Sequence, residues 1–477
     1  MRRYQLSPNI RIVHDNGSGM AMVYHTLYGN PRIVNNEGLR FLELFRQPTT
    51  AEEISEACDD DPGEAVRDFT SIFFLIEPGF DEKKFLRDKM EQQLSHVQEC
   101  RTVDRMGLAI SDSCNLGCAH CIHFQPSTNS GRSLPMYQRS VPQLNMTRET
   151  ARKCVDRYIG LLRSQNKNRG NIHFGNAEPL LNWPVIERML EYCERVDDFS
   201  FEFAINTNLV LMTRPIAETL KRYRVRIATS LDGTRAANDA VRITKNGQGT
   251  FARIIEKFDL LAEIGYPLDG FSITVTKDNF ELVGTDIIDL AIERRMKSIA
   301  FDYDLVGLIH VPVEKRIMKL MQLKKYANEH GVIFHGTWDS PFRNLTSGSM
   351  LSGDYAFCAA VQGKSLEFGV DGNIRICSHT TAPIGHMDNF GEVFRKGGSL
   401  MQIVAGRFPG TDVFCSGCDI EGLCGGQCHV TREVVSRSRD DERQKLFGDM
   451  CDFYRGITMA LAAEYLRSGV ITASGNK

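Results

Sequence analysis

The sequence predicts an α/β protein in which six strand–helix units form a partial or closed barrel, between a small N-terminal unit and a cysteine-rich C-terminal region. Strand-like and helix-like apolar patterns alternate from residue 105 to about residue 338. A separate group of strands and helices precedes them. Periodicity fades from about Ser340 as Gly and Cys become frequent, until a closing helix is predicted at Phe453–Leu466. Repeated strand–helix units imply a parallel sheet with right-handed crossovers.

The N-terminal unit is expected to place strands before helices. Its strands are predicted at Ile10–His14, Met20–Tyr24 and Arg32–Val34, with a turn over Asp15–Gly19. Its helices are predicted at Asn36–Phe45, from Thr50 onward and at Pro62–Leu75, and a linker helix follows at Glu82–Gln98. The segment Thr50-Ala-Glu-Glu53 has the pattern of a capping box, which predicts the start of the second helix.

The barrel region contains six candidate strands with helices between and after them. The strands are Met106–Ile110, Asn171–Phe174, Phe199–Ala204, Val225–Ser230, Phe271–Val275 and Ser298–Phe301. The helices are Arg148–Arg163, Pro184–Arg195, Pro215–Tyr223, Thr250–Ile264, Leu282–Glu293 and Pro312–His330. Ligands of such sheets bind at the carboxyl ends of the strands, so we expect the functional residues there.

Composition excludes several classes of protein. The formal net charge is −3, from 57 basic and 60 acidic residues, so no broad basic surface for nucleic acid is expected. There is no secretory signal and no apolar run of roughly 18 residues, so we expect a cytosolic protein without membrane segments. Cytosolic thiols stay reduced, so the clustered members of the 14 cysteines point to metal binding. Four lone cysteines are predicted to be small buried residues of helices: Cys58, Cys100, Cys154 and Cys193.

The first cluster is Cys114-x3-Cys118-x2-Cys121, which directly follows a predicted strand. Thiolates are the usual ligands of iron–sulfur clusters. A cubane has four irons, so three cysteines would leave one iron open for a substrate or cofactor. A structural zinc site is the alternative, with His120 or His123 as the fourth ligand.

This spacing after a first strand resembles the signature of the radical S-adenosylmethionine (SAM) superfamily. The resemblance implies a TIM-like (β/α)6 partial barrel, a [4Fe–4S] cluster on these cysteines, and SAM as cofactor. The residue before the third cysteine is usually aromatic in that family, and here it is His120, which can still pack over the adenine. Gly175-Asn-Ala-Glu178-Pro179 is similar to the family's Gly-Gly-Glu-Pro motif and departs from it at the second glycine. The resemblance makes Glu178 the partner of the cofactor's ammonium group, and a carboxylate at a helix N-terminus is the alternative.

Further polar residues lie at later strand ends. Asn206 ends the third predicted strand, and Ser230-Leu-Asp232-Gly ends the fourth, with Arg242 twelve residues after Ser230. By resemblance, Ser230 and Arg242 bind the cofactor's carboxylate and ribose, and Asn206 lines the same pocket. Asp232 is a candidate base for a substrate thiol. Taken singly, each of these residues could equally be an ordinary turn or cap residue.

The second cluster contains seven cysteines, and its pattern resembles the SPASM extension that carries auxiliary iron–sulfur clusters. By resemblance, one [4Fe–4S] cluster is bound by Cys415, Cys418, Cys424 and Cys451, and another by Cys358, Cys377 and Cys428. The second set has three thiols, so it leaves an open iron or uses another ligand such as His379. Zinc ribbons are the alternative, although zinc sites use four ligands each.

The first 80 residues resemble the PqqD-like winged-helix domain, which binds the leader of a precursor peptide. A structural or oligomerising domain is the alternative, and nothing basic marks a DNA-binding helix. The domains are then expected at residues 1–84 (recognition), 85–104 (linker helix), 105–338 (barrel), 339–460 (SPASM) and 461–477 (tail). The polar segment 124–144 is either a substrate-covering loop or a disordered one.

Together these features resemble the peptide-maturing radical SAM enzymes, among which the maturases of the quinohemoprotein amine dehydrogenase small subunit are one candidate. The resemblance implies a 5′-deoxyadenosyl radical that removes hydrogen from a precursor peptide or small protein subunit. Joining Cys sulfur to carbon, a thioether crosslink, is the leading hypothesis. Carbon–carbon crosslinking, oxidation, and a zinc-stapled scaffold without activity are the alternatives. A flavodoxin or ferredoxin is the expected electron donor.

Overall fold

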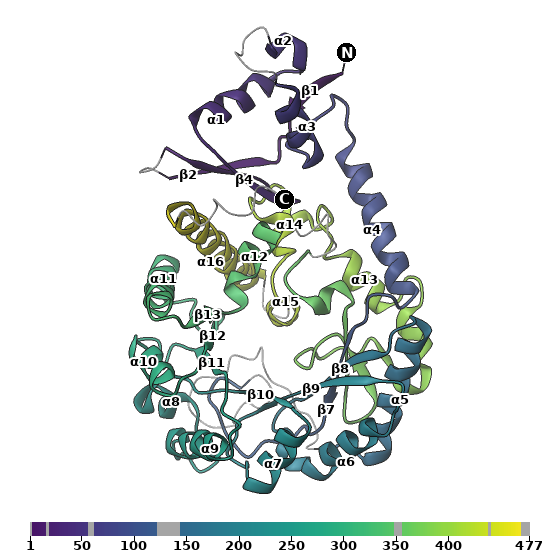
Figure 1. Ribbon diagram of the computed structural model, residues 1–477, viewed down its shortest axis with the longest axis vertical. Coiled ribbons are helices and arrows are strands. Elements are labelled where there is room, and N and C mark those ends of the chain that lie inside the picture. Colours follow the sequence, from purple (N-terminus) through teal and green to yellow (C-terminus); the bar gives the residue numbers. More distant parts are fainter. Residues whose placement is uncertain are drawn as a thin grey trace.

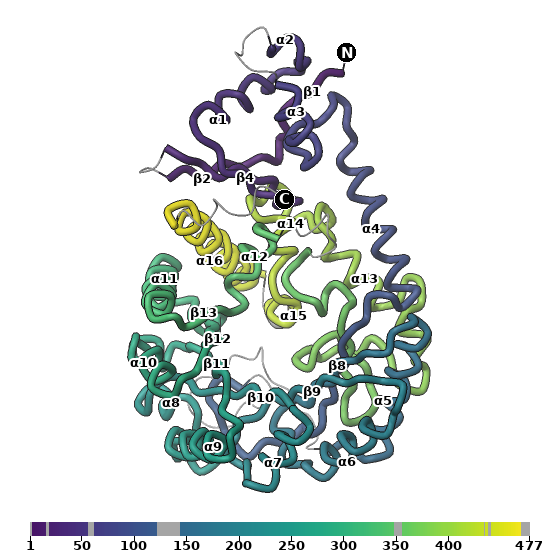
Figure 2. The backbone as a smooth tube through the Cα atoms, in the orientation of Figure 1, coloured from purple at the N-terminus to yellow at the C-terminus, as the bar shows by residue number. Residues whose placement is uncertain are grey.

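The computed structural model describes residues 2–15, 19–55, 62–121, 144–347, 355–436 and 440–468. Five predicted features lie wholly or mostly outside these residues: the turn at 15–19, Cys58, His123, the loop 124–144 and the end of the tail. In Figure 1 the N-terminal unit lies at one end of the molecule and the barrel at the other, with the C-terminal helices α14, α15 and α16 between them. The tube in Figure 2 shows α4 running along one side from the N-terminal unit toward the barrel.

The predicted partial barrel of six parallel strands is confirmed. Its strands are β7 (Arg105–Ala109), β8 (Arg169–Gly175), β9 (Ser200–Thr207), β10 (Arg226–Thr229), β11 (Gly270–Val275) and β12 (Ser298–Tyr303). Strands β7 to β10 pair in sequence order in one sheet, and β11 pairs with β12 in another. A parallel bridge between Ser230 and Ser272 joins the edges of the two sheets. Six consecutive strands therefore share one direction and present their carboxyl ends at one rim.

Helices follow the strands and cover the outside of the barrel (Figure 1). They are α5 (Arg148–Ser164), α6 (Trp183–Glu194), α7 (Arg214–Arg222), α8 (Arg235–Val241), α9 (Phe251–Glu263), α10 (Asp286–Glu293) and α11 (Val313–Glu329). Successive residues of a strand face opposite sides of the sheet. Met106 and Leu108 of β7 are therefore buried in the main core, and Gly107 lies on the opposite face. Gly107 pairs in register with His173 of β8, which places both residues on the inner face.

The C-terminal region has more regular structure than its sequence predicts. Strand β13 (Ile333–His335) adds to β12, and β14 (Ser365–Phe368) pairs in parallel with β7. Strands β15 (Asn373–Arg375) and β16 (Gly385–His386) continue that sheet. These strands were missed because each has four residues or fewer, too short for a period to be visible. The barrel sheet thus extends past the predicted boundary at residue 338.

Helices complete the C-terminal region: α12 (Ser340–Ser347), α13 (Ser399–Ala405), α14 (Glu421–Cys424), α15 (His429–Ser436) and α16 (Asp440–Arg467). The predicted closing helix was Phe453–Leu466, so α16 begins earlier than expected. The first turn of α16 contains Asp440, Asp441 and Glu442 and has no apolar stripe. The start of the helix therefore could not be predicted from apolar periodicity. Among the described residues, no helix combines the length and apolar composition that crossing a bilayer requires.

The N-terminal unit confirms the expected strands and helices and adds a second small sheet. It contains β2 (Ile10–His14), β3 (Ala21–His25), β4 (Gly29–Val34), α1 (Asn36–Glu43), α2 (Ala51–Ser55), α3 (Gly63–Ser71) and the linker helix α4 (Glu82–Gln98). The additional strands are β1 (Arg3–Leu6), β5 (Thr49–Thr50) and β6 (Leu75–Ile76), with β1 in the middle. The capping box is confirmed, because Thr50 and Glu53 exchange backbone-to-side-chain hydrogen bonds of 3.0 and 3.1 Å.

Strand β3 is buried on both faces, which attaches the N-terminal unit to the rest of the molecule. Val23 packs in the small N-terminal core, whereas Met22 and Tyr24 belong to the main core. The Tyr24 hydroxyl donates to the Met459 sulfur of α16 at 3.8 Å. The turn after β3 enters the cysteine-rich region, where Gly422 N–H donates to the Thr26 carbonyl at 3.0 Å. The N-terminal unit is therefore packed into the C-terminal region.

The lone cysteines are placed partly as predicted. Cys154 and Cys193 are buried in α5 and α6. Cys100 instead lies in the turn after α4, half-buried and with a φ of +61°. The helical prediction for Cys100 was wrong because α4 ends at Gln98.

Replacing Gly422 with alanine is expected to loosen this attachment. A Cβ at position 422 would lie 2.0 Å from the Leu27 carbonyl oxygen, and neither backbone can yield without moving the turn after β3. We expect Gly422→Ala to lower the free energy of unfolding by about 1–3 kcal/mol, measured by thermal and urea unfolding of the full chain. The control is Gly160→Ala, on the exposed side of α5 with no atom within 4 Å, which should be neutral or slightly stabilising. Equal stability of Gly422→Ala and Gly160→Ala would show that the close packing of Gly422 against the Leu27 carbonyl does not matter for stability.

Candidate active site

The cysteine loop begins directly after β7, at the rim formed by the strand ends. Its backbone pairs with the segment that follows α8: Gly117 N–H donates to the Ile243 carbonyl at 2.8 Å, and Ala119 N–H to the Val241 carbonyl at 2.9 Å. An antiparallel bridge between Leu116 and Thr244 continues the pairing. The segment that carries Arg242 therefore lies alongside the cysteines.

The three thiols of this loop lie close enough to interact electrostatically. Burial raises the pKa of Cys114 to about 12, and the neighbouring thiols of Cys121 and Cys118 add to the shift. Burial likewise raises the pKa of Cys118 to about 11, although Arg242 opposes the shift. The Cys114 sulfur accepts from the Asn208 side chain at 3.7 Å and from the Leu116 backbone at 3.4 Å. Buried cysteine sulfurs that accept hydrogen bonds from N–H groups are well suited to bind an iron–sulfur cluster as thiolates.

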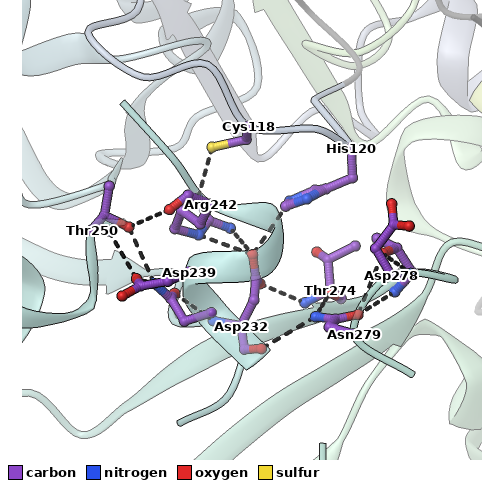
Figure 3. A network of polar contacts seen from close by, with 11 residues as sticks. Cys118, His120, Asp232, Asp239, Arg242, Thr250, Thr274, Asp278 and Asn279 are labelled. Atoms are coloured by element: carbon purple, nitrogen blue, oxygen red, sulfur yellow. Dashed lines mark hydrogen bonds and ion pairs between the residues drawn. The ribbon is translucent and has the colours of Figure 1, made fainter. Parts of the chain in front are cut away.

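Arg242, Asp232 and His120 form a buried network beside this loop (Figure 3). The Arg242 guanidinium donates through Nε to one carboxylate oxygen of Asp232 at 3.0 Å, and its Nη2 forms an ion pair with the same oxygen at 2.8 Å. Its Nη1 lies 3.8 Å from the Cys118 sulfur. His120 Nε2 lies 3.4 Å from the same Asp232 oxygen, and the other oxygen accepts from Thr274 N–H at 2.8 Å. The network joins the cysteine loop to the ends of β10 and β11.

This network bears on the roles predicted for Asp232 and Arg242. Asp232 is fully buried, and both of its carboxylate oxygens already have partners, so its placement supports a positioning role. The prediction that Asp232 is a base for a substrate thiol gains no support from this geometry. Arg242 is 8% exposed and is directed toward Asp232 and Cys118. The predicted pairing of Arg242 with a cofactor carboxylate would have to compete with these contacts.

Glu178 is fully buried and holds two strand ends together. Its Oε1 accepts from the Thr207 hydroxyl at 2.7 Å and from Leu180 N–H at 3.0 Å. Its Oε2 accepts from Asn208 N–H at 2.8 Å. Burial raises its pKa to about 7, against the lowering effect of these donors. The carboxylate thus caps the short helical turn Pro179–Asn182, and its predicted role toward an ammonium group remains untested.

The departure from the Gly-Gly-Glu-Pro pattern has a structural counterpart. Asn176 and Ala177 both have left-handed backbone, with φ of +69° and +40°. Asn tolerates this region better than most residues, and the Asn176 side chain donates to the Ser111 carbonyl at 3.2 Å and to the Asp112 side chain. The loop after β8 is thereby tied to the loop after β7. The side-chain contacts of Asn176 fix a bend that glycine would permit by its flexibility alone.

The other predicted cofactor residues lie on the inner face of the barrel. Asn206 is an exposed residue of β9 whose side chain contacts the His173 ring. Ser230 is half-buried and forms the bridge to Ser272. Sequence reasoning missed Asn208 and Thr274, which contact Cys114 and Asp232. The triplet Asn206-Thr207-Asn208 at a strand end was the available signal for Asn208.

Four late cysteines line one cavity: Cys415, Cys418, Cys424 and Cys451. They are the set predicted to share a cluster. Burial raises the pKa of Cys424 to about 12, and the thiols of Cys451 and Cys418 add to the shift. Gln427 donates to the Cys451 sulfur at 3.0 Å.

The remaining three late cysteines also lie near one another. Burial raises the pKa of Cys377 to about 12, with further contributions from Glu367, Cys428 and Cys358. The backbone N–H of His379 faces the Cys377 sulfur, and the His379 side chain is exposed. Among the described residues, no group of three or more His, Cys, Asp or Glu side chains has the spacing for a single metal ion. The assignment of each cysteine set to a cluster remains a prediction.

Comparison with known proteins defines the class of the barrel. Residues 108–282 match the model of the Radical SAM superfamily, so the chain contains a radical SAM domain. Such a domain implies SAM and a [4Fe–4S] cluster as cofactors. The chain is 24% identical to the radical SAM cyclopropyl synthase TigE of Paramaledivibacter caminithermalis over 412 residues, which cover 85% of each protein.

Solved structures share the fold at low sequence identity. Native anSMEcpe with bound AdoMet has a TM-score of 0.57 at 16% identity, covering 75% of this chain and 99% of that one. SuiB of Streptococcus suis bound to precursor peptide SuiA has a TM-score of 0.52 at 15% identity, covering 93% of this chain and 98% of that one. The second alignment extends over nearly the whole chain, beyond the barrel.

Replacing Glu178 with glutamine is expected to destabilise the protein even without any cofactor. An amide –NH2 in place of Oε2 would face Asn208 N–H, so two donors would meet in a buried site. We expect a loss of about 1–3 kcal/mol in the free energy of unfolding, measured by urea unfolding of cofactor-free protein. The control is Glu202→Gln, at an exposed position of β9, with an expected change within about 0.5 kcal/mol. Unchanged stability of Glu178→Gln would instead favour a role confined to cofactor binding.

Proposed function

We propose that this chain is a radical SAM enzyme that modifies a ribosomally made peptide or small protein at an unactivated carbon. The observation that carries the proposal is the cysteine loop of a radical SAM domain at the rim of a six-strand barrel, with a second thiol-rich region attached to the same sheet. Peptides are the proposed substrate class because SuiB was solved with a precursor peptide. The cyclopropyl synthase TigE, which aligns over 85% of this chain, supports bond formation at carbon.

The proposed cluster ligands are Cys114, Cys118 and Cys121. When bound, the cluster and SAM supply a 5′-deoxyadenosyl radical that removes a hydrogen atom from a carbon of the substrate. Glu178 accepts from Asn208 N–H and so holds the strand ends at the proposed cofactor site, and His120, beside the third cysteine, contacts Asp232. Asn206 and Ser230 are proposed contacts of the cofactor from the inner face. The zinc-stapled scaffold loses support, because a radical SAM domain implies an iron–sulfur cluster.

Formation of a new bond at carbon removes two hydrogens from the substrate. One leaves as the hydrogen atom taken by the radical, and the other leaves as a proton together with one electron. That electron needs an acceptor, and clusters held by the late cysteines are the acceptors proposed here. We propose Cys415, Cys418, Cys424 and Cys451 as ligands of one auxiliary [4Fe–4S] cluster, and Cys358, Cys377 and Cys428 as ligands of another. A cytosolic flavodoxin or ferredoxin would supply the initiating electron.

The N-terminal unit is proposed to bind the leader of the substrate peptide, as a PqqD-like domain would. Its strands offer edges to which an extended peptide can add by backbone hydrogen bonds. The proposal is supported by its attachment, because β3 packs against α16 and the turn after β3 contacts Gly422 between two cluster cysteines. A leader bound there would bring the following residues toward the barrel.

The bond formed is proposed to be a thioether between Cys sulfur and carbon. Support comes from the three-thiol set of Cys358, Cys377 and Cys428, which leaves one position for a substrate thiolate. Carbon–carbon ring closure is the second candidate, and the alignment with TigE specifically favours it. Both reactions remove two hydrogens, so the mass of the product alone does not separate them.

The cluster assignment is tested by replacing cysteines with alanine in anaerobically prepared protein. Wild-type protein is expected to contain about twelve irons, since each cubane has four. The triple variant at Cys114, Cys118 and Cys121 should lose about four irons and all 5′-deoxyadenosine production. Cys193→Ala, at a buried lone cysteine of α6, should keep both. Zinc in place of iron, or production that survives the triple variant, would refute the assignment.

The bond type is tested by co-expression with candidate substrate peptides from short open reading frames near the gene, followed by mass spectrometry of a peptide that is modified. A thioether predicts loss of two hydrogens for each bond and protection of one substrate Cys from iodoacetamide. The matched control is a peptide in which that Cys is replaced by Ser, which should no longer be modified. Loss of two hydrogens in the Ser peptide would reject the thioether and support carbon–carbon bond formation.

A further inference from the structure

We infer that Arg242 acts on the cluster rather than on the cofactor's carboxylate: Asp232 positions its guanidinium so that it donates to the Cys118 sulfur and raises the reduction potential of the cluster. The inference rests on the proposed cluster at Cys114, Cys118 and Cys121. It does not depend on the peptide substrate or on the bond formed.

The guanidinium directs its Nε and Nη2 side to Asp232 and its remaining nitrogen to a cysteine sulfur. Nε donates to one oxygen of Asp232 at 3.0 Å, and Nη2 forms an ion pair with the same oxygen at 2.8 Å. The remaining nitrogen, Nη1, lies 3.8 Å from the Cys118 sulfur, an ordinary distance for a bond to sulfur. Bidentate recognition of a carboxylate through Nε and Nη2 would have to displace Asp232, and recognition through Nη1 and Nη2 would compete with Cys118.

Arg242 is held in this position by contacts that need no cofactor. Its backbone N–H donates to the Asn238 carbonyl at 2.7 Å, and its carbonyl accepts from the Thr250 hydroxyl at 2.8 Å. Asp232 is held in turn by Thr274 N–H at 2.8 Å. The pairing of the cysteine loop with residues 241–244 then brings Cys118 to the guanidinium.

A positive charge beside a ligand sulfur favours the reduced cluster, which carries one more negative charge. Hydrogen bonds to the sulfurs and nearby charge are among the factors that set cluster potentials. Arg242 and Asp232 are 8% and 0% exposed, so little solvent screens the interaction. Figure 3 places the guanidinium between Cys118 and Asp232, so the positive charge is the nearer of the two to the sulfur.

The test compares Arg242→Gln with Lys245→Gln, an exposed lysine of the same segment that serves as the matched control. The cluster potential is measured by redox titration with electron paramagnetic resonance detection, in the absence of SAM. We expect a more negative potential for Arg242→Gln and no shift for Lys245→Gln. Dissociation constants for SAM are measured in parallel, and we expect Arg242→Gln to change SAM affinity by less than about threefold.

The opposite results overturn the inference. An unchanged potential would show that Arg242 does not act on the cluster. A loss of SAM affinity of about tenfold or more, the expected effect of removing a hydrogen bond to a charged group, would make Arg242 a ligand of the cofactor. Absence of iron from the wild-type protein would refute the proposed function itself, which is a separate outcome.

A measurement on the wild-type protein covers the case in which Arg242→Gln fails to assemble the cluster. Protein made with arginine labelled by ¹⁵N in the guanidinium is reduced and examined by pulsed electron paramagnetic resonance. We expect a weak ¹⁵N coupling to the cluster, because Nη1 lies 3.8 Å from the Cys118 sulfur. Absence of this coupling overturns the inference without any substitution.

Discussion

Asp232 and Arg242 form a buried ion pair, 2.8 Å apart, where β10 reaches the rim of the barrel. Several chain segments meet on this pair. The carboxylate accepts from the backbone of β11 and contacts His120 of the cysteine loop, and Asn279 donates to the Asp232 carbonyl at 3.2 Å. Removing one partner of a buried pair leaves an uncompensated charge at a cost of about 3–5 kcal/mol. The charge pair therefore links the cysteine loop to the ends of β10 and β11, in addition to the backbone pairing with residues 241–244.

A second constraint links the two thiol-rich regions. Strand β14 pairs with β7, so the sheet that leads into the cysteine loop also carries β15, which ends two residues before Cys377. Gly107 of β7 makes room for this arrangement, because a Cβ there would lie 1.7 Å from the Glu367 carboxylate of β14. Burial raises the pKa of Glu367 to about 8, against the lowering effect of Arg375, and its carboxyl group fills the space beside Gly107. The distance between the first cysteine cluster and Cys377 is thus set within one sheet.

Much of the barrel could be predicted because its strands and helices are long enough for their periods to be visible. The linker helix was predicted with the bounds it has, and the capping box at Thr50 predicted the second helix correctly. Short elements were missed, including β5 and β6 with two residues each, because two residues carry no period. The polar first half of α16 was missed because its acidic turns resemble a loop.

The sequence by itself determined which residues are candidates for the chemistry. It revealed the spacing of the cysteines, the turn that contains Glu178 and the polar residues at the strand ends. Tertiary structure decided what these residues contact. Arg242 and Asp232 lie ten positions apart, yet their roles follow from Cys118 and Thr274, which belong to distant segments. A buried guanidinium binds whichever acceptors the fold places at its nitrogens. Only the three-dimensional pairing of residues 241–244 with the cysteine loop showed that one of these acceptors is a cysteine sulfur.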